Sequence, residues 1–282
     1  MRTIVAIFAP FLLMQVACAQ PKPARLIVRG DDMGYTHSGN EAIIRSYKNG
    51  IEKSVEVIVA SPWFPEAVKL LEQNPGIDVG IHLAITSEWE NIKWRPLSDC
   101  PSLKDSNGYF HPMVYPEKNY PGQSIKESNW QIADIEKEFR AQIELAMKRI
   151  SHITHISSHM GCTGLTEEVK ALAKRLAKEY RIDIDPSDYG VISVGYAGPN
   201  KTPADKIQSF MKMLDKLEPG KIYLFLDHPG LDNDELRAVW HIGYEYVAID
   251  RQGVTDLFTS EKVKAYIRQK GIQIIGYNDL LK

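Results

Sequence analysis

Two adjacent aspartates, Asp31 and Asp32, follow closely on the apolar run 26–28. Neighbouring carboxylates repel each other and lose hydration when buried, so the pair indicates a stabilising partner, most often a metal ion. One carboxylate can then bind the cation while the other accepts a proton from a water molecule. The alternative is a helix N-terminus, where acids are common and Ser38 or Asn40 would act as the cap.

Two histidines offer ligands of matching type. His82 ends the apolar run that begins at Val79, and His159 ends the run that begins at Ile153. One aspartate and two imidazoles, each at the carboxyl end of a different strand, form a zinc-type shell with room for a water molecule. Along a strand His155 would share a face with His159, and we expect it to pack behind the site rather than bind the metal.

A third histidine, His228, lies where another apolar run stops. Asp227 precedes it, and a Pro-Gly pair turns the chain immediately after it. A histidine at such a rigid corner suits a general acid or a hydrogen-bond donor to an oxyanion. We expect Asp227 to orient this ring and to contribute to substrate binding, and a turn histidine without a catalytic role is the alternative.

Strand and helix signals alternate along the chain, which is typical of a parallel sheet covered by helices. The strand-like runs are 25–29, 55–60, 78–84, 154–157, 181–185, 222–227 and 272–276, and the helix-like runs are 40–49, 65–73, 132–149, 166–180, 203–217 and 260–269. Seven such units predict a single α/β domain forming an irregular, TIM-barrel-like (β/α) barrel, with a doubly wound open sheet as the alternative. Both place ligands at the carboxyl ends of the strands, where the aspartates and the three histidines lie.

The segment 86–130 is too long for an ordinary connection and is rich in aromatic residues and proline. It follows directly on His82, so we expect it to cover the site. Aromatic rings near a polar metal site suit sugar rings, and Trp89 and Trp94 are the predicted substrate-binding residues. The alternative is that these rings form a small core of the loop itself, and we expect some of both.

The N-terminus has the pattern of a secretory signal peptide. Arg2 precedes an apolar run from residue 4 to residue 16, which ends in Ala-Cys-Ala before Gln20. That run is shorter than the roughly 20 residues of a membrane span. We therefore expect residues 1–19 to be a signal peptide, residues 20–282 to be the mature domain, and the protein to be exported to the periplasm or secreted. Lipidation at Cys18 is the less favoured alternative.

The bulk properties exclude some partners. A net charge of −2 over 282 residues argues against nucleic acid or an anionic membrane surface as the main partner. The mature chain keeps Cys100 and Cys162, which either form one disulfide or stay as two thiols. The sequence leaves a homodimer open.

In several motifs the chain resembles the YdjC-like carbohydrate deacetylases, which include chitooligosaccharide deacetylases. The first is Arg-Gly-Asp-Asp-Met-Gly, where the family typically has Asn/Arg-Ala-Asp-Asp-Phe-Gly, and the motifs lie at 29–34, 40–44, 74–83, 154–159, 227–230 and 271–280. The resemblance implies an irregular (β/α) barrel and one divalent metal ion, with zinc favoured and magnesium as the alternative. By motif position, Asp32, His82 and His159 are the implied ligands, Asp31 is the implied base, and His228 matches a late histidine near the site.

The reaction implied by the resemblance is hydrolysis of the N-acetyl group of an amino sugar or oligosaccharide. The chain departs from the family pattern after the third ligand strand. Ser157 stands where the family has an aspartate, Met160 and Gly161 replace polar positions, and 248–254 lacks a family-like Arg-Glu-x-Glu. These departures imply that the metal ligands survive but that the support behind them and part of the substrate pocket do not.

Two other functions fit the same residues. A carbohydrate-binding protein on a degenerate deacetylase scaffold would keep the fold without the chemistry, and a metal-dependent esterase would use the same site on another bond. The intact Asp31, Asp32, His82 and His159 favour an enzyme. Few basic residues flank the motifs, which argues against a phosphate substrate.

Overall fold

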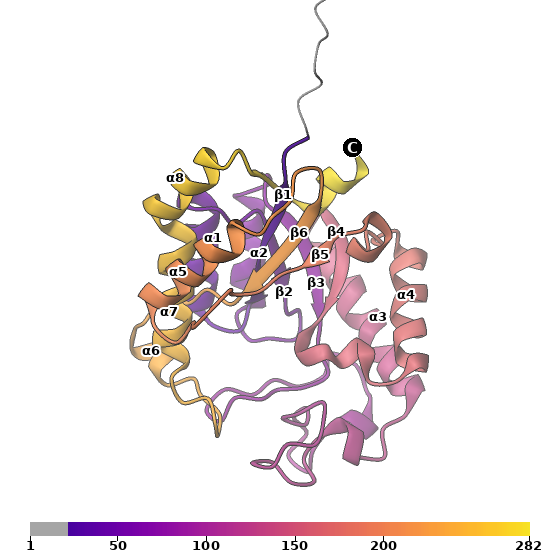
Figure 1. Ribbon diagram of the computed structural model, residues 1–282. Helices are drawn as coiled ribbons and strands as arrows, with labels where there is room; N and C mark the ends of the chain where they lie inside the picture. Colours follow the sequence, from indigo (N-terminus) through magenta and orange to yellow (C-terminus); the bar gives the residue numbers. More distant parts are fainter. Residues whose placement is uncertain (1–21) are drawn as a thin grey trace, which may run out of the picture.

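The computed structural model describes residues 22–282, so the predicted signal peptide and Cys18 lie outside the described residues. A parallel sheet forms the centre, with helices packed around it (Figure 1). Its seven strands are β1 Arg25–Met33, β2 Ser54–Val57, β3 Asp78–Leu83, β4 Ile153–Ser158, β5 Ile192–Ser193, β6 Ile222–Asp227 and β7 Gln273–Ile275. Among the helices described for this range, none is long and apolar enough to cross a membrane.

The helices lie between the strands in the chain. They are α1 His37–Asn49, α2 Phe64–Glu72, α3 Ile132–Arg149, α4 Glu167–Tyr180, α5 Pro203–Leu214, α6 Asp234–Arg237, α7 Val247–Thr259 and α8 Glu261–Gln269. Short 3₁₀ helices are η1 Pro101–Leu103, η2 Ile125–Glu127, η3 His159–Gly164, η4 Pro186–Tyr189 and η5 Tyr277–Leu281. Thr36, rather than Ser38 or Asn40, caps α1 by accepting a hydrogen bond from the backbone N–H of Gly39.

The sheet is curled into a half-barrel. The strand order is β4-β3-β2-β1-β6-β5, and β7 pairs with the first residues of β1. Strands β4 and β5 are the two ends of this order, and no pairing between them closes a ring in the described chain. The single α/β domain is therefore consistent with the prediction, whereas a full TIM barrel is not confirmed. The alternation of strand and helix signals in the sequence predicts how many strands a sheet has, but it does not show whether the two edge strands pair to close a barrel.

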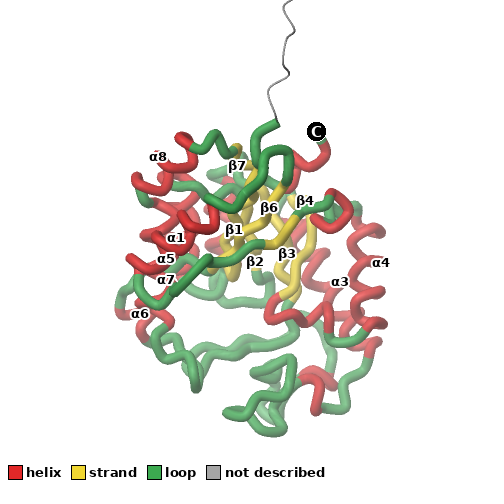
Figure 2. The backbone as a smooth tube through the Cα atoms, viewed as in Figure 1, coloured by secondary structure: helices red, strands yellow, loops and turns green. Residues whose placement is uncertain are grey.

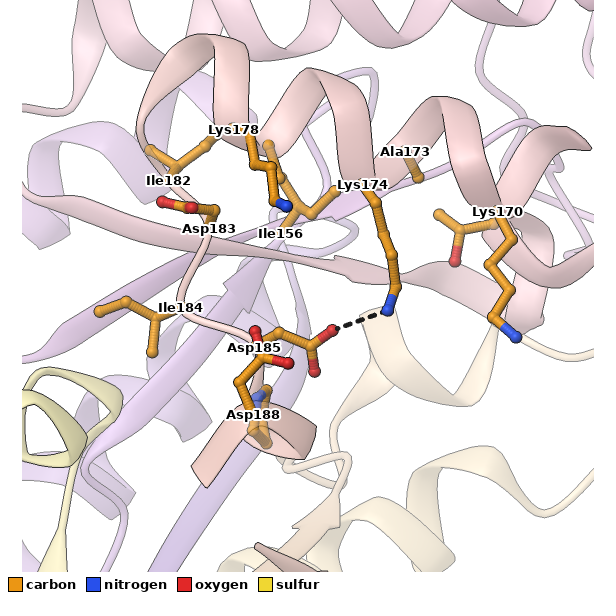
Figure 3. Close-up of a pocket in the computed structure, with 13 residues that line it drawn as sticks. Ile156, Lys170, Ala173, Lys174, Lys178, Ile182, Asp183, Ile184, Asp185 and Asp188 are labelled. Atoms are coloured by element: carbon orange, nitrogen blue, oxygen red, sulfur yellow. Dashed lines mark ion pairs between the residues drawn. The ribbon is translucent and has the colours of Figure 1, made fainter. Parts of the chain in front are cut away.

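The predicted strand at 181–185 is wrong. Arg181 adopts a left-handed conformation that ends α4, and Pro186 opens η4, so only a short irregular segment is left between them. That segment makes one long backbone hydrogen bond to β4, from Ile184 to Thr154 at 3.5 Å. It lines an outer pocket of about 340 Å³ opposite the lysines of α4 (Figure 3). None of the predicted site residues lines this pocket. The strand that pairs with β6 on the side away from β1 is the two-residue strand β5, not the segment 181–185.

The segment 86–130 spreads over the end of the half-barrel at which the strands stop, as the green loops in Figure 2 show. Trp89, Trp94, Leu103, Phe110, Tyr120 and Ile125 are buried within it. All of them except Tyr120 belong to the same hydrophobic cluster as strand residues such as Val57 and Ile81, so they extend the main core and do not form a separate core of the loop. Cys100 of the loop and Cys162 of η3 are both buried free thiols, so the two do not form a disulfide.

Candidate active site

The adjacent aspartates owe their arrangement to a β-bulge. In the pairing of β1 with β2, Gly30 lies opposite Val55 and Met33 lies opposite Val57, so Asp31 and Asp32 together face the single residue between them. Successive side chains of a regular strand point to opposite faces. Here Asp32 has a φ of 72°, a left-handed value that non-glycine residues adopt mainly at functional sites. The bulge therefore lets both carboxylates lie at one site.

Asp32, His82 and His159 come together as the sequence predicted. One ligand atom from each lies within 4.8 Å of the others, and all three residues are buried. The Asp32 Oδ1 atom lies 3.1 Å from His159 Nδ1 and 3.5 Å from His82 Nε2. A tetrahedral ion with bonds of about 2.0–2.2 Å keeps its ligand atoms about 3.3–3.6 Å apart. The donor types and these distances fit a divalent metal ion.

His82 is held from behind by a chain of strand residues. Its Nδ1 atom lies 2.6 Å from the Ser157 hydroxyl, and that hydroxyl donates a short hydrogen bond to the Glu56 carboxylate. The other oxygen of Glu56 lies 2.6 Å from Nε2 of His155. The implied loss of support behind the ligands is therefore wrong for His82. The Ser157 hydroxyl lies between the Glu56 carboxylate and His82, so a carboxylate still supports this ring indirectly.

Room for this chain of contacts comes from a glycine. Gly80 of β3 lies between Glu56 of β2 and His155 of β4 in the sheet register. A Cβ atom at Gly80 would come within 2.3 Å of a Glu56 carboxylate oxygen and 2.4 Å of the His155 ring. His155 also stacks on Tyr277 at a ring distance of 3.5 Å. The expected packing role of His155 is confirmed.

His159 is held by the long loop instead of by a strand. Its Nε2 atom lies 3.0 Å from the Glu88 carboxylate, while its Nδ1 atom faces Asp32. Burial disfavours a charged ring, but Glu88 and Asp32 outweigh burial and raise the pKa of His159 to about 10. His82 differs, because burial and the nearby His159 lower its pKa to about 4.

Asp31, the predicted base, is fixed by an arginine. The Arg29 guanidinium donates two hydrogen bonds to its carboxylate, at 2.7 and 2.9 Å, in the fork geometry typical of this pair. Arg29 also donates to the Tyr277 hydroxyl at 2.8 Å. One Asp31 oxygen lies 3.9 Å from His82 Nε2. The carboxylate is thus beside the candidate metal position in a fixed orientation, as a proton acceptor requires.

Arg251 of α7 is a site residue that sequence reasoning missed. Its guanidinium donates to Asp32 Oδ2 at 2.8 Å and lies over the rings of Tyr35 and Trp89. Despite burial, the charges of His228, Arg251 and His159 hold the pKa of Asp32 well below its ordinary value. The Nε and NH1 atoms of Arg251 have no hydrogen-bond partner among the described residues, which leaves buried donors for a bound ligand.

His228 lies at the predicted corner, next to both acids. Its Nε2 atom is 3.8 Å from Asp32 Oδ2, and its Nδ1 atom is 3.5 Å from Asp227 Oδ1. Although burial opposes protonation, Asp32 and Asp227 raise the pKa of His228. Asp227 also accepts a hydrogen bond from the Tyr196 hydroxyl at 2.6 Å. These contacts agree with the expected orienting role of Asp227, and its substrate contact stays a prediction.

The two predicted substrate tryptophans are buried. Trp89 is 2% exposed and packs against Tyr35 and His241, and Trp94 is 3% exposed beside His159. Neither ring presents an open face in this conformation, so their contact with a sugar stays a prediction. The structure assigns them a packing position that supports Arg251 and His159.

A further acid, Glu52, is buried near the base without a partner. Its two carboxyl oxygens make no hydrogen bond within the described chain, and they lie where a Cβ of Gly30 would be. Burial and the charge of Asp31 raise the pKa of Glu52 well above its ordinary value. The direction of this shift is opposite to that of Glu56 and Glu88, whose pKa values are lowered by the charges beside them.

The chain is similar to several known proteins over most of its length. The sequence profile of the YdjC-like protein family matches residues 25–269. Carbohydrate deacetylase 1 of Listeria innocua is 27% identical over 263 residues, covering 91% of this chain and 100% of the relative. Carbohydrate deacetylase of Geobacillus stearothermophilus is 27% identical, covering 92% and 99%. A solved structure from Enterococcus faecalis, described as a cellobiose-phosphate cleavage protein, has a TM-score of 0.71 at 24% identity and covers 92% of this chain and 99% of its own, which shows a shared fold.

Proposed function

The chain belongs to the YdjC-like protein family, and from this premise we propose that it is a metal-dependent carbohydrate deacetylase. The reaction is hydrolysis of an acetamide on an amino sugar or oligosaccharide, a C–N bond other than a peptide bond. The observation that carries the proposal is the cluster of Asp32, His82 and His159 with Asp31 beside it. The curated relatives named carbohydrate deacetylase support the substrate class.

Asp32, His82 and His159 would hold the metal, with zinc favoured over magnesium for a site of two imidazoles and one carboxylate. A divalent metal in this position supplies Lewis acidity toward a carbonyl oxygen and toward water. Arg251 balances the charge of Asp32 at Oδ2, whereas His82 and His159 face Oδ1. The contacts from Glu56 through Ser157, and from Glu88, fix the orientation of the two imidazole rings.

The chain's own groups divide the proton transfers. Asp31, held by Arg29, takes the proton from the attacking water molecule. Asp32 and Asp227 raise the pKa of His228 against the effect of burial, which favours its acid form, and His228 donates a proton to the leaving amine.

The test is acetate release from N,N′-diacetylchitobiose by protein loaded with zinc or magnesium, with the Asp31→Asn variant in parallel. We expect turnover in the parent protein and a loss of about 10²-fold or more in the variant, which keeps its metal. No acetate release from a metal-loaded protein that binds the sugar would favour the carbohydrate-binding alternative. Hydrolysis of acetyl esters alone would favour the esterase.

We also propose that residues 1–19 are removed during export, which leaves Gln20 as the first residue. The support is the basic start, the short apolar run and the small residues before Gln20. The mass of the protein recovered from the periplasm or the medium tests it. A retained N-terminus, or a lipid on Cys18, would contradict this cleavage.

A further inference from the structure

The groups of the catalytic centre differ widely in exposure. The side chains of Asp31, Asp32, His82 and His159 are between 2% and 5% exposed, whereas that of His228 is 35% exposed. The last of these also lies within 3.8 Å of Asp32. A substrate that reaches the two aspartates therefore approaches past His228.

His228 lies on the wall of a hollow of about 650 Å³, which we call the His228 hollow. Volumes of roughly 300–1,000 Å³ are typical of small-molecule sites. The hollow is bounded by the end of β6, by the chain that follows β5, and by the start of α7. It therefore adjoins the catalytic centre on the side that is open to solvent.

Large apolar side chains are exposed around this hollow. Leu226 is 42% exposed, Tyr246 is 73% exposed and Ile249 is 55% exposed, and all three line it. Exposed apolar side chains that gather around a polar pocket commonly mark a binding site. The flat C–H faces of a sugar ring match such a rim, because they stack on aromatic and aliphatic surfaces.

The polar groups of the hollow are paired with one another. The ammonium of Lys206 lies 2.8 Å from Asp250 Oδ1 and 3.8 Å from Asp227 Oδ2, and its side chain is 3% exposed. The hydroxyl of Tyr196 donates to the same Asp227 carboxylate. Lys201 also lines the hollow, at an exposed position. With the buried charges neutralised internally, hydroxyl groups suit this surface better than a phosphate or a carboxylate does.

We propose that the His228 hollow binds a neutral sugar ring next to the acetylated residue, and that it makes the enzyme select saccharides over small acetyl compounds. This inference rests on the proposed function. It moves saccharide recognition from the buried Trp89 and Trp94 to exposed residues at the end of β6 and at the start of α7. The loop has a hollow of its own, of about 450 Å³, lined by Tyr115 and Ile242 among others, and it provides the matched control.

The experiment compares Tyr246→Ala and Ile249→Ala with Tyr115→Ala, an exposed tyrosine of the loop hollow. Each variant is assayed on N,N′-diacetylchitobiose and on 4-nitrophenyl acetate. We expect the first two to raise KM for the disaccharide by about tenfold, with a far smaller change on the ester, and the control to match the parent on both. A raised KM in the control, with parent-like values in the other two, would place the sugar on the loop side and overturn the proposal. Equal losses on both substrates would do so too.

A second arm separates this inference from the proposed function. Calorimetric titration with the same disaccharide, with each variant carrying Asp31→Asn to suppress turnover, measures binding alone, so weaker binding by Tyr246→Ala supports the hollow even if no acetate is released. Parent-like binding by both hollow variants overturns it even if acetate is released. Titration with N-acetylglucosamine 6-phosphate tests whether the hollow prefers a neutral sugar. Binding of this phosphate more than tenfold tighter than N-acetylglucosamine would contradict that preference.

Discussion

The two candidate histidine ligands are held in contrasting ways. His82 is supported by strand residues, with Ser157 and Glu56 behind it, whereas His159 is supported by Glu88 of the segment 86–130. Their pKa values differ in the same way: burial lowers that of His82 to about 4, and Glu88 and Asp32, acting against burial, raise that of His159 to about 10. The sheet therefore presents one imidazole ready to bind a metal, and the loop presents one that must first lose a proton.

The largest effect on this contrast comes from removing both rings. In the double variant His82→Ala, His159→Ala we expect complete loss of the metal, because Asp32 alone cannot hold it. Elemental analysis of protein purified without chelator measures the metal content. Full retention of metal in the double variant would mean that these side chains are not its ligands, and the single variants would show which side contributes more.

The next largest effect on metal affinity is expected from Glu56 and Glu88, the two carboxylates behind the imidazole rings. Glu56→Gln and Glu88→Gln each remove one carboxylate behind an imidazole, and loss of such contacts typically lowers metal affinity by about 10–100-fold. Competition with a chromophoric chelator measures the affinity. Glu138→Gln is a control, since this buried glutamate contacts Ser98 and Gln142 away from the site. Unchanged affinity in both site variants would show that the supports are dispensable.

The pH dependence of metal binding distinguishes the two sides. A raised pKa of about 10 keeps His159 protonated in the metal-free protein, so binding displaces one proton and affinity rises about tenfold per pH unit between pH 7 and 9. Glu88→Gln removes one cause of the raised pKa and should flatten this slope, whereas Glu56→Gln should keep it. The affinity measured from pH 7 to pH 9 gives the slope, and the binding enthalpy measured by calorimetry in buffers of different ionisation enthalpy gives the proton count. Equal slopes of metal affinity against pH in Glu88→Gln and Glu56→Gln would show that the two histidines do not differ in the way proposed.

The smallest effect on the metal is expected at Glu52, the buried acid without a partner. Its pKa is raised by burial and by Asp31, so the folded protein retains a proton that the unfolded chain loses above its ordinary pKa of 4.5. The protonated acid therefore costs stability as pH rises from about 4.5 toward the folded pKa. Glu52→Gln should reduce this decline, while metal affinity stays within about twofold of the parent. Urea unfolding at pH 5 and pH 8 measures it, and an unchanged pH dependence would contradict it.

Much of the candidate site follows from the sequence because parallel strands end at one edge of a sheet. That rule alone brings Asp32, His82 and His159 together. The supports could not be found in this way. Glu56 lies in the middle of a four-residue strand, and its contact with His155 depends on the sheet curvature and on the space above Gly80.

The other omissions have different causes. Glu88 lies in a loop, where spacing along the chain says little about which side chains meet. Arg251 lies in α7, a helix that was not predicted, since its sequence has threonine, valine and Gly253 among its apolar residues and lacks clear helical periodicity. Strand β5 was misplaced because only two exposed residues form it, whereas the alternating residues 181–185 resemble a strand but end at Pro186.

The bulge in β1 restricts which sequence changes the site can accept during evolution. Two residues occupy the space opposite one, so deleting either position removes one carboxylate and restores regular alternation, which resets the direction of the other. Substitutions can tune Asp31 and Asp32 separately, but insertions and deletions change both together. The two aspartates are therefore expected to be kept or lost together when the length of β1 changes. The same arrangement can be recognised in other parallel sheets where two residues of one strand lie opposite one residue of its neighbour.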